Sequence, residues 1–176
     1  MNRTYIKDAI PGTPCRIRGF IENIRNKRTM AFLVIRDVTG KLQLTIEKEK
    51  MPEIAAVVDQ LMLESVVTVT GTVVENENVK LGGREMLPET MVIDSLADAI
   101  PIGPDANIDT RLDYRWIDLR TEKNLLMFRV QTTFVNAMRR FLVDRNFIEI
   151  HTPKLIGAAS ESGADVFELT YFDRKA

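Results

Sequence analysis

Hydrophobic and polar residues alternate over much of the first hundred residues, a pattern that predicts half-buried β-strands. Strands are expected over residues 15–25, 31–37, 41–47 and 65–74, and within 86–95. Between the third and the fourth of these, Pro52 begins a short stretch with apolar residues at helical spacing, which predicts a helix. The first hundred residues are therefore expected to be mainly β, with one helix between two sets of strands.

The order of these elements, three strands, a helix and two strands, is that of an OB-fold, a five-stranded Greek-key barrel. Such barrels bind single-stranded nucleic acid on the face built around their second and third strands. They use aromatic rings for base stacking and polar side chains for the base edges.

Alternation divides the side chains of the second and third strands between two faces. The positions that share one face are Phe32, Val34 and Arg36 in the second strand and Lys41, Gln43 and Thr45 in the third. Gln43 lies between Leu42 and Leu44, which fill the core, so its side chain is expected to point away from the core. For Phe32 the pattern allows two interpretations, an ordinary core residue or a base-stacking platform on the outer face.

A linker is predicted over residues 100–104, which are rich in proline and glycine. Residues 109–120 follow, densely charged and interleaved with aromatic residues. This segment is compatible with a hinge held by salt bridges and with part of a nucleic-acid-binding surface.

A long amphipathic helix is predicted beyond the charged segment, because apolar residues recur at spacings of three and four. The apolar stripe consists of Met127, Val130, Phe134, Met138 and Phe141. Asn146, which tolerates positive φ, is expected to end the helix. Ile148–Ile150 alternates with period two and predicts a short strand, closed by Pro153, which has no N–H to donate.

Charge is unevenly distributed, although the formal net charge of the chain is only −1. Residues 1–50 carry eleven Lys or Arg against five Asp or Glu, whereas residues 51–104 carry two against nine. A basic first part favours a polyanionic partner such as a nucleic acid. A solvated charged surface is the alternative.

The single cysteine and the single histidine exclude several kinds of site. Cys15 alone cannot form an internal disulfide or a multi-cysteine zinc site, and it is expected to be buried at the start of a strand. His151 alone argues against a histidine metal cluster or a catalytic triad. With no apolar run of roughly 18 residues and no signal peptide, a cytoplasmic protein without a membrane partner is expected.

Five segments, in this order, resemble the N-terminal part of aspartyl-tRNA synthetases of the archaeal and eukaryotic type. They are residues 32–37 with Gln43, 85–89, 109–120, 147–154 and 159–164. The resemblance covers nearly the whole chain and implies a mainly β protein with α elements. It implies three parts: an OB-fold anticodon-binding domain over residues 1–104, a hinge over 105–124, and over 125–176 the truncated start (helix plus strand) of a class II antiparallel α/β catalytic domain.

Within the barrel, the resemblance assigns residues to the anticodon. Phe32 resembles the aromatic residue that stacks on an anticodon base, and Gln43 the glutamine that reads the central base. Glu85 matches an acid that contacts the last anticodon base. The expected contacts with the tRNA backbone are Arg25, Lys27 and Arg28 of the basic loop.

The second half resembles the first class II signature, the helix and strand that form a homodimer interface. Phe134, Met138 and Pro153 are expected in this interface. Glu161 resembles the acid that accepts the ammonium group of the substrate aspartate, and Ser162 lies in the same loop, where the family more often has glycine. Because the rest of the catalytic sheet is missing, the apolar stripe is expected to be partly exposed and the chain to form a dimer or an aggregate.

The second and third class II signatures, which carry the arginines that clamp ATP, are not found in these 176 residues. The resemblance implies a parent aspartate–tRNA ligase that uses aspartate, ATP and Mg²⁺. The chain itself is expected to bind the tRNA anticodon loop without aminoacylation activity, and to have no catalytic residue, metal or cofactor of its own.

Other interpretations remain open. An asparaginyl enzyme shares the barrel and the hinge, although residues 160–167 followed by Tyr171–Phe172 favour the aspartyl type. A relaxed enzyme that charges both tRNAs with aspartate is also compatible, because Glu22 stands where the family commonly has an aromatic residue or histidine. From a different class, a free-standing single-strand-binding OB module would have no use for a dimer helix, and a purely structural dimerisation protein would not bind RNA.

Overall fold

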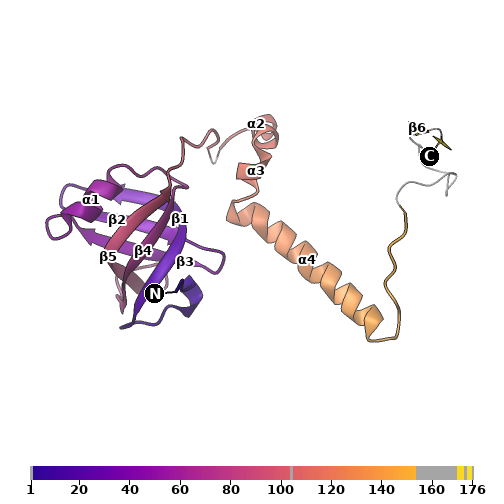
Figure 1. Ribbon diagram of the computed structural model, residues 1–176, viewed down its shortest axis with the longest axis horizontal. Helices are drawn as coiled ribbons and strands as arrows, with labels where there is room; N and C mark the ends of the chain where they lie inside the picture. Colours follow the sequence, from indigo (N-terminus) through magenta and orange to yellow (C-terminus); the bar gives the residue numbers. More distant parts are fainter. Residues whose placement is uncertain (1, 104, 154–169, 173, 176) are drawn as a thin grey trace. The chain divides into compact units, whose positions relative to one another are not determined.

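The computed structural model describes residues 2–103, 105–153, 170–172 and 174–175 (Figure 1). The chain divides into two compact units, residues 1–110 and 111–176, and each is described by itself. The first unit contains η1 (Ile6–Asp8), β1 (Pro14–Asn26), β2 (Met30–Arg36), β3 (Lys41–Glu47), α1 (Pro52–Val58), β4 (Val66–Glu75) and β5 (Arg84–Ser95). The second contains α3 (Arg115–Asp118), α4 (Glu122–Val143), β6 (Thr170–Tyr171) and β7 (Arg174–Lys175), and α2 (Ile108–Asp113) spans the boundary.

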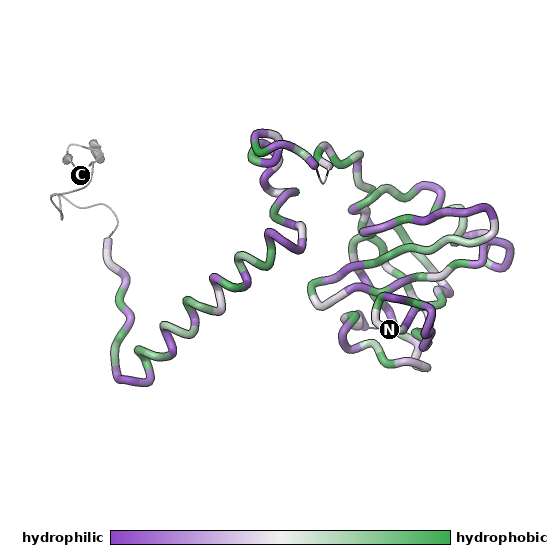
Figure 2. Tube along the Cα trace, turned by 180° about the vertical axis from the view of Figure 1, so that it is seen from behind, coloured by the Kyte–Doolittle hydropathy of each residue, from purple (hydrophilic) through white to green (hydrophobic). Residues whose placement is uncertain are grey.

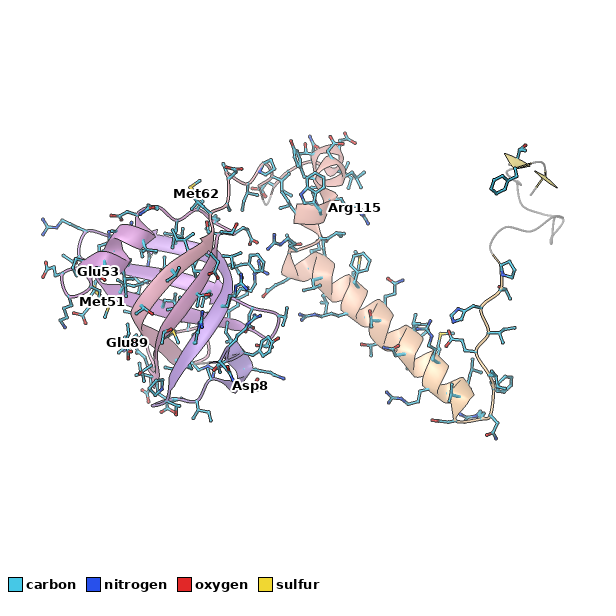
Figure 3. All side chains as sticks on the ribbon, in the orientation of Figure 1. Asp8, Met51, Glu53, Met62, Glu89 and Arg115 are labelled. Carbon is cyan, nitrogen blue, oxygen red and sulfur yellow. The ribbon has the colours of Figure 1, made fainter. Side chains whose placement is uncertain are left out.

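The strands of the first unit close into a barrel in the order β1-β2-β3-β5-β4. Neighbouring strands are antiparallel, except that β3 and β5 run parallel. In the chain, α1 lies between β3 and β4, and Met51 and Glu53 flank its first proline (Figure 3). This arrangement confirms the predicted OB-fold.

Alternate apolar residues of all five strands fill the barrel interior. Figure 2 shows the corresponding change between hydrophobic and hydrophilic positions along the strands. The fully buried strand residues are Ile17, Ile21, Ala31, Leu33, Ile35, Leu42, Leu44, Ile46, Val67, Val69, Val73 and Met86. β3 has the predicted bounds, and the other strands differ from the predicted ones by one or two residues at their ends. Cys15 is buried as predicted, and burial raises the pKa of its thiol.

An N-terminal segment that the sequence pattern did not predict packs into the barrel core. Ile6 of η1 is almost completely buried and belongs to the core cluster. Its N–H donates to Asp37 Oδ2 at 2.9 Å, and the Arg84 guanidinium donates to the carbonyl oxygens of Ile6 and Ala9 at 3.0 and 2.9 Å. The β2–β3 turn and β5 therefore satisfy the backbone polar groups that this segment brings into the core.

The charged segment after the linker forms short helices joined by an ion pair. Arg111 Nε donates to Asp118 Oδ1 at 2.8 Å, and Asn124 Nδ2 donates to Asp118 Oδ2 at 2.8 Å. The hydrogen bond from Arg111 is the main reason that the pKa of Asp118 is lowered, and the same bond raises the pKa of Arg111. This ion pair shows that the segment contains a salt bridge. The hinge and the expected domain boundaries after residues 104 and 124 stay predictions.

The long helix α4 begins at Glu122, five residues earlier than Met127, and ends at Val143, three residues before the predicted Asn146. Asn146 has φ of 64°, and its N–H donates to Val143 O at 3.0 Å. The Phe147 N–H donates to Leu142 O at 3.1 Å, which completes a Schellman motif.

The strand predicted over Ile148–Ile150 is wrong: residues 147–153, with Pro153 at their end, have no regular secondary structure. A strand needs a neighbour that takes up its backbone N–H and C=O groups. Among the described residues of this unit, the other strands are β6 and β7, which pair with each other. Alternation of apolar and polar residues is therefore not enough for a strand here, because no described strand pairs with residues 148–150.

Candidate nucleic-acid interface

The outer face of β2 and β3 carries the predicted aromatic and polar positions as three cross-strand pairs. The pairs are Phe32 with Thr45, Val34 with Gln43, and Arg36 with Lys41. All six residues are half-buried, whereas the residues between them are buried in the core. Phe32 is therefore an outer-face residue, and Gln43 points away from the core as alternation predicted.

β5 brings a buried carboxylate next to Gln43. Glu85 is the partner of Gln43 in the parallel ladder between β3 and β5. Gln43 Nε2 donates to Glu85 Oε2 and to Thr45 Oγ1, both at 3.1 Å, and Thr45 Oγ1 in turn donates to Glu85 Oε2. From the turn after β4, Asn76 Nδ2 donates to Glu85 Oε1 at 2.7 Å. Both oxygens of Glu85 thus accept hydrogen bonds from neighbouring side chains.

The β1–β2 hairpin adds positive charge beside Phe32. Arg25 is the cross-strand partner of Phe32, and its guanidinium carbon lies 4.4 Å from the centre of the Phe32 ring. Lys27 and Arg28 are exposed in the turn, which the Lys27 N–H closes by donating to Met30 O at 2.9 Å. The guanidinium lies over the ring at a cation–π distance, so this face of Phe32 is turned towards the basic hairpin and not into the core.

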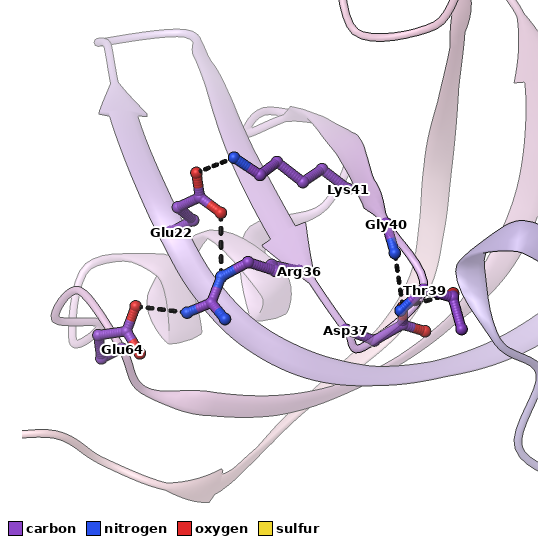
Figure 4. Close-up of polar contacts among 7 residues, drawn as sticks. All are labelled: Glu22, Arg36, Asp37, Thr39, Gly40, Lys41 and Glu64. Carbon is purple, nitrogen blue, oxygen red and sulfur yellow. Dashed lines mark hydrogen bonds and ion pairs between the residues drawn. The ribbon is translucent and has the colours of Figure 1, made fainter. Parts of the chain in front are cut away.

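At the third pair, acidic side chains neutralise the two cations (Figure 4). Arg36 Nε forms an ion pair with Glu22 Oε2 at 3.0 Å, and Arg36 Nη2 donates a hydrogen bond to Glu64 Oε1 at 2.8 Å. Lys41 Nζ donates to the other oxygen of Glu22 at 2.5 Å. The positive charges of Arg36 and Lys41 are therefore neutralised within the face. The excess positive charge next to the face comes from the basic hairpin.

Other residues expected in a site lie in the second unit. Phe134 and Met138 are exposed on α4, whose side chains stand out from the helix (Figure 3), and Pro153 is exposed beyond it. Glu161 and Ser162 lie outside the described residues.

Two members of the cluster around Gln43 were not predicted as site residues, Thr45 and Asn76. The alternation of β3 placed Thr45 on the correct face but did not indicate its contact with a carboxylate. No sequence signal relates Asn76 to Glu85, because the turn between β4 and β5 decides where the amide points.

The outer face combines an aromatic ring, an amide, a carboxylate and an adjacent basic hairpin, which are the groups that recognise single-stranded nucleic acid. Within the described ranges, no group of three or more His, Cys, Asp or Glu residues could hold a metal ion. Among the same residues, no helix has both the length and the apolar character needed to cross a membrane.

Relatives of known function match the chain from end to end. An aspartate–tRNA(Asp) ligase of Picrophilus torridus is 38% identical over 179 residues, covering 99% of this chain and 42% of the relative. An aspartate–tRNA(Asp/Asn) ligase of Methanopyrus kandleri is 40% identical over 181 residues, covering 98% of this chain and 42% of the relative. The chain thus spans less than half the length of these curated relatives.

The fold also matches that of solved tRNA synthetase structures. The asparaginyl-tRNA synthetase from Pyrococcus horikoshii, solved in complex with asparaginyl-adenylate, matches with a TM-score of 0.91 and 29% identity, over 99% of this chain and 42% of that one. Residues 15–93 match the family of OB-fold nucleic acid binding domains, and residues 107–174 match the class II tRNA synthetases for D, K and N. These matches confirm the resemblance drawn from the sequence, and the chain belongs to the class II tRNA synthetases of the D, K and N type.

Proposed function

We propose that this chain is the anticodon-reading N-terminal part of an aspartate–tRNA ligase. The observation that carries the proposal is the Gln43–Glu85 hydrogen bond beside the outward-facing Phe32 on the wall of an OB-fold barrel. The similarity to aspartate–tRNA ligases along the whole chain supports the choice of tRNA as the nucleic acid.

Base stacking and base selection need different groups, and this face has both. The ring of Phe32 stacks any base, which contributes about 1–3 kcal/mol per base but little selectivity. Selectivity comes from hydrogen bonds to the base edge. Gln43 is the diagonal cross-strand neighbour of Phe32, and such neighbours lie roughly 7 Å apart. A base on the Phe32 ring therefore has its edge within reach of the Gln43 amide.

The basic hairpin supplies the contacts to the RNA backbone in this proposal. Arg25, Lys27 and Arg28 are all exposed, and Arg25 lies directly against the stacking ring. Their contribution is electrostatic and independent of base sequence, so it weakens steeply as salt rises.

Phe32→Ala is expected to weaken binding of an anticodon stem-loop reading GUC by about 1–3 kcal/mol, because one stacked base is lost. Fluorescence anisotropy at fixed salt, with stem-loops reading GUC, GUU and an unrelated triplet, measures the effect. The intact chain is expected to prefer GUC over the unrelated triplet.

Val92→Ala is the matched control, because Val92 is an exposed apolar residue of β5 outside the three cross-strand pairs. It should bind the GUC stem-loop like the intact chain. Equal binding of all three stem-loops, unaffected by Phe32→Ala, would show that the basic hairpin is only an electrostatic surface and would remove the proposal.

Three alternative functions give different results in binding titrations of this kind. A relaxed enzyme for both tRNAs would bind GUC and GUU equally, and an asparaginyl enzyme would prefer GUU; the relatives include both aspartate–tRNA(Asp) and aspartate–tRNA(Asp/Asn) ligases. A free-standing single-strand-binding module would bind oligo-dT about as well as the anticodon stem-loop.

The parent enzyme, in this proposal, attaches aspartate to tRNA with ATP and Mg²⁺ in the cytoplasm, and Glu161 and Ser162 serve its aspartate-binding loop. The 176 residues alone bind tRNA without charging it. Their part in the reaction is to bind the anticodon loop and so hold the tRNA on the enzyme.

We also propose that the apolar stripe of α4 forms a homodimer contact. Phe134 is 65% exposed and Met138 is 51% exposed. Exposed apolar side chains that lie together on one face mark a site of protein association. Sedimentation at tens of micromolar is expected to show a dimer or larger species, shifted towards monomer by Phe134→Asp. Thr132→Asp, on the opposite side of α4, is the control. A monomeric chain at this concentration would contradict the proposal.

A further inference from the structure

We infer that Glu85 is a positioning residue, which orients the Gln43 amide so that its carbonyl oxygen, and not its NH₂ group, meets the base. The pair then selects a pyrimidine that carries an N–H at N3 of its Watson–Crick edge, as uracil does, and rejects cytosine, which has a lone pair there. This inference rests on the proposed function and deepens it, because it assigns the selectivity of the face to one amide orientation.

The orientation of Gln43 follows from the chemistry of its neighbour. A carboxylate can only accept hydrogen bonds, so the Gln43 end that faces Glu85 must be the donor, Nε2. Nε2 faces Glu85 Oε2 and Thr45 Oγ1 together, at 3.1 Å from each, so both neighbours hold the donor end of the amide on the Glu85 side. Thr45 cannot reverse this arrangement, because its single hydroxyl hydrogen is donated to Glu85. Oε1 is left as the atom directed away from the cluster.

Glu85 itself is poorly placed to touch a ligand. Glu85 is only 7% exposed, whereas Gln43 is half-buried on the outer face. Asn76 occupies Oε1 of Glu85, while Gln43 and Thr45 occupy Oε2. With both oxygens engaged, the carboxylate acts on the ligand through the amide that it orients.

An outward carbonyl oxygen discriminates between the two pyrimidines. The Watson–Crick edge of uracil carries an N–H at N3, which can donate to Gln43 Oε1. Cytosine has a lone pair at the same position, so the two acceptors would face each other without a hydrogen between them. Sites built around such a hydrogen bond reject the mismatched partner because a polar group is left unpaired.

The test measures binding of stem-loops reading GUC and GCC, which differ at the central base, to the 176-residue chain at fixed salt. The intact chain is expected to bind GUC roughly tenfold or more tightly than GCC. Glu85→Gln has an amide that can donate or accept, so the Gln43 amide can turn over. In this variant the two stem-loops are expected to bind within about threefold of each other.

Glu89→Gln is the matched control, the same chemical change on an exposed residue of the same strand (Figure 3). It should keep the preference of the intact chain. Thr45→Val provides a second variant should Glu85→Gln fail to fold, because it removes one acceptor of Nε2; it should reduce the GUC:GCC ratio by about threefold.

The outcomes separate this inference from the proposed function. If Glu85→Gln keeps the GUC:GCC ratio but loses the preference for GUC over GUU, Glu85 contacts the last base directly. The inference is then wrong, while the proposed function stands. If the intact chain does not distinguish these stem-loops from an unrelated triplet, the proposed function itself fails.

Discussion

Replacement of Gly71 by alanine is expected to lower the free energy of unfolding of the barrel by about 3 kcal/mol. A Cβ atom at this position would lie 2.2 Å from Leu87 O and 2.8 Å from Pro88 Cα, both of them backbone atoms. Gly71 is opposite Pro88 where the register between β4 and β5 shifts, and it also pairs with Cys15 on β1. Because strands on both sides hold it, the backbone cannot move aside without disturbing the closed barrel.

A urea titration followed by far-UV circular dichroism measures this loss, since the only tryptophan, Trp116, lies outside the barrel strands. Gly103→Ala is the control, because no heavy atom lies within 4 Å of the Cβ that it adds. The control should unfold within about 0.5 kcal/mol of the intact chain. A similar midpoint for Gly71→Ala would show that β4 and β5 do not approach each other as the structure has them.

The barrel could be predicted because local patterns decide its strands. Leu42, Leu44 and Ile46 alternate with polar residues, and this alternation alone places Gln43 on the outer face. The position of Phe32 is a weaker case, because a phenylalanine fits either side of a strand. The register of β2 with β3 resolves it, and this register is set by a short turn between neighbouring strands.

Long-range placements could not be predicted in the same way. Glu85 becomes buried beside Gln43 only because β5 returns parallel to β3, across 42 residues of sequence. Asn76 reaches the same carboxylate from a turn, and Ile6 enters the core from a segment without a periodic pattern. The alternation of Ile148–Ile150 illustrates the converse error, a local pattern without a partner strand.

The turn between β2 and β3 combines both kinds of information. Val38–Lys41 has the composition of a turn, which the sequence shows, but the role of Asp37 depends on distant groups. Its Oδ1 accepts hydrogen bonds from the Thr39 N–H at 2.7 Å and the Gly40 N–H at 3.1 Å, and its Oδ2 accepts from the Ile6 N–H (Figure 4 shows the turn). Asp37 therefore joins the turn to the N-terminal segment that completes the core.

Asp37→Asn is expected to lower the free energy of unfolding at pH 7 by about 2 kcal/mol, because an amide NH₂ would face backbone donors. Burial tends to raise the pKa of Asp37, but the hydrogen bonds from Thr39, Ile6 and Gly40 outweigh it, and the pKa is lowered from the ordinary value of 3.8. A carboxyl group with a lowered pKa in the folded state contributes stability above its unfolded pKa, and this contribution is lost as the pH falls through the folded value.

The stability gap between the intact chain and Asp37→Asn should therefore be constant from pH 7 to about pH 5 and shrink below about pH 4, where protonated Asp37 is neutral like asparagine. Urea midpoints across this pH range measure the gap. The control is Asp98→Asn, at an exposed aspartate beyond β5, which should leave the midpoint unchanged at every pH. Since other carboxyl groups titrate equally in both chains, only Asp37 can make the gap depend on pH. A gap that stays the same at pH 3 and pH 7 would mean that the carboxylate charge does not hold the N-terminal segment, leaving Arg84 as its main polar anchor.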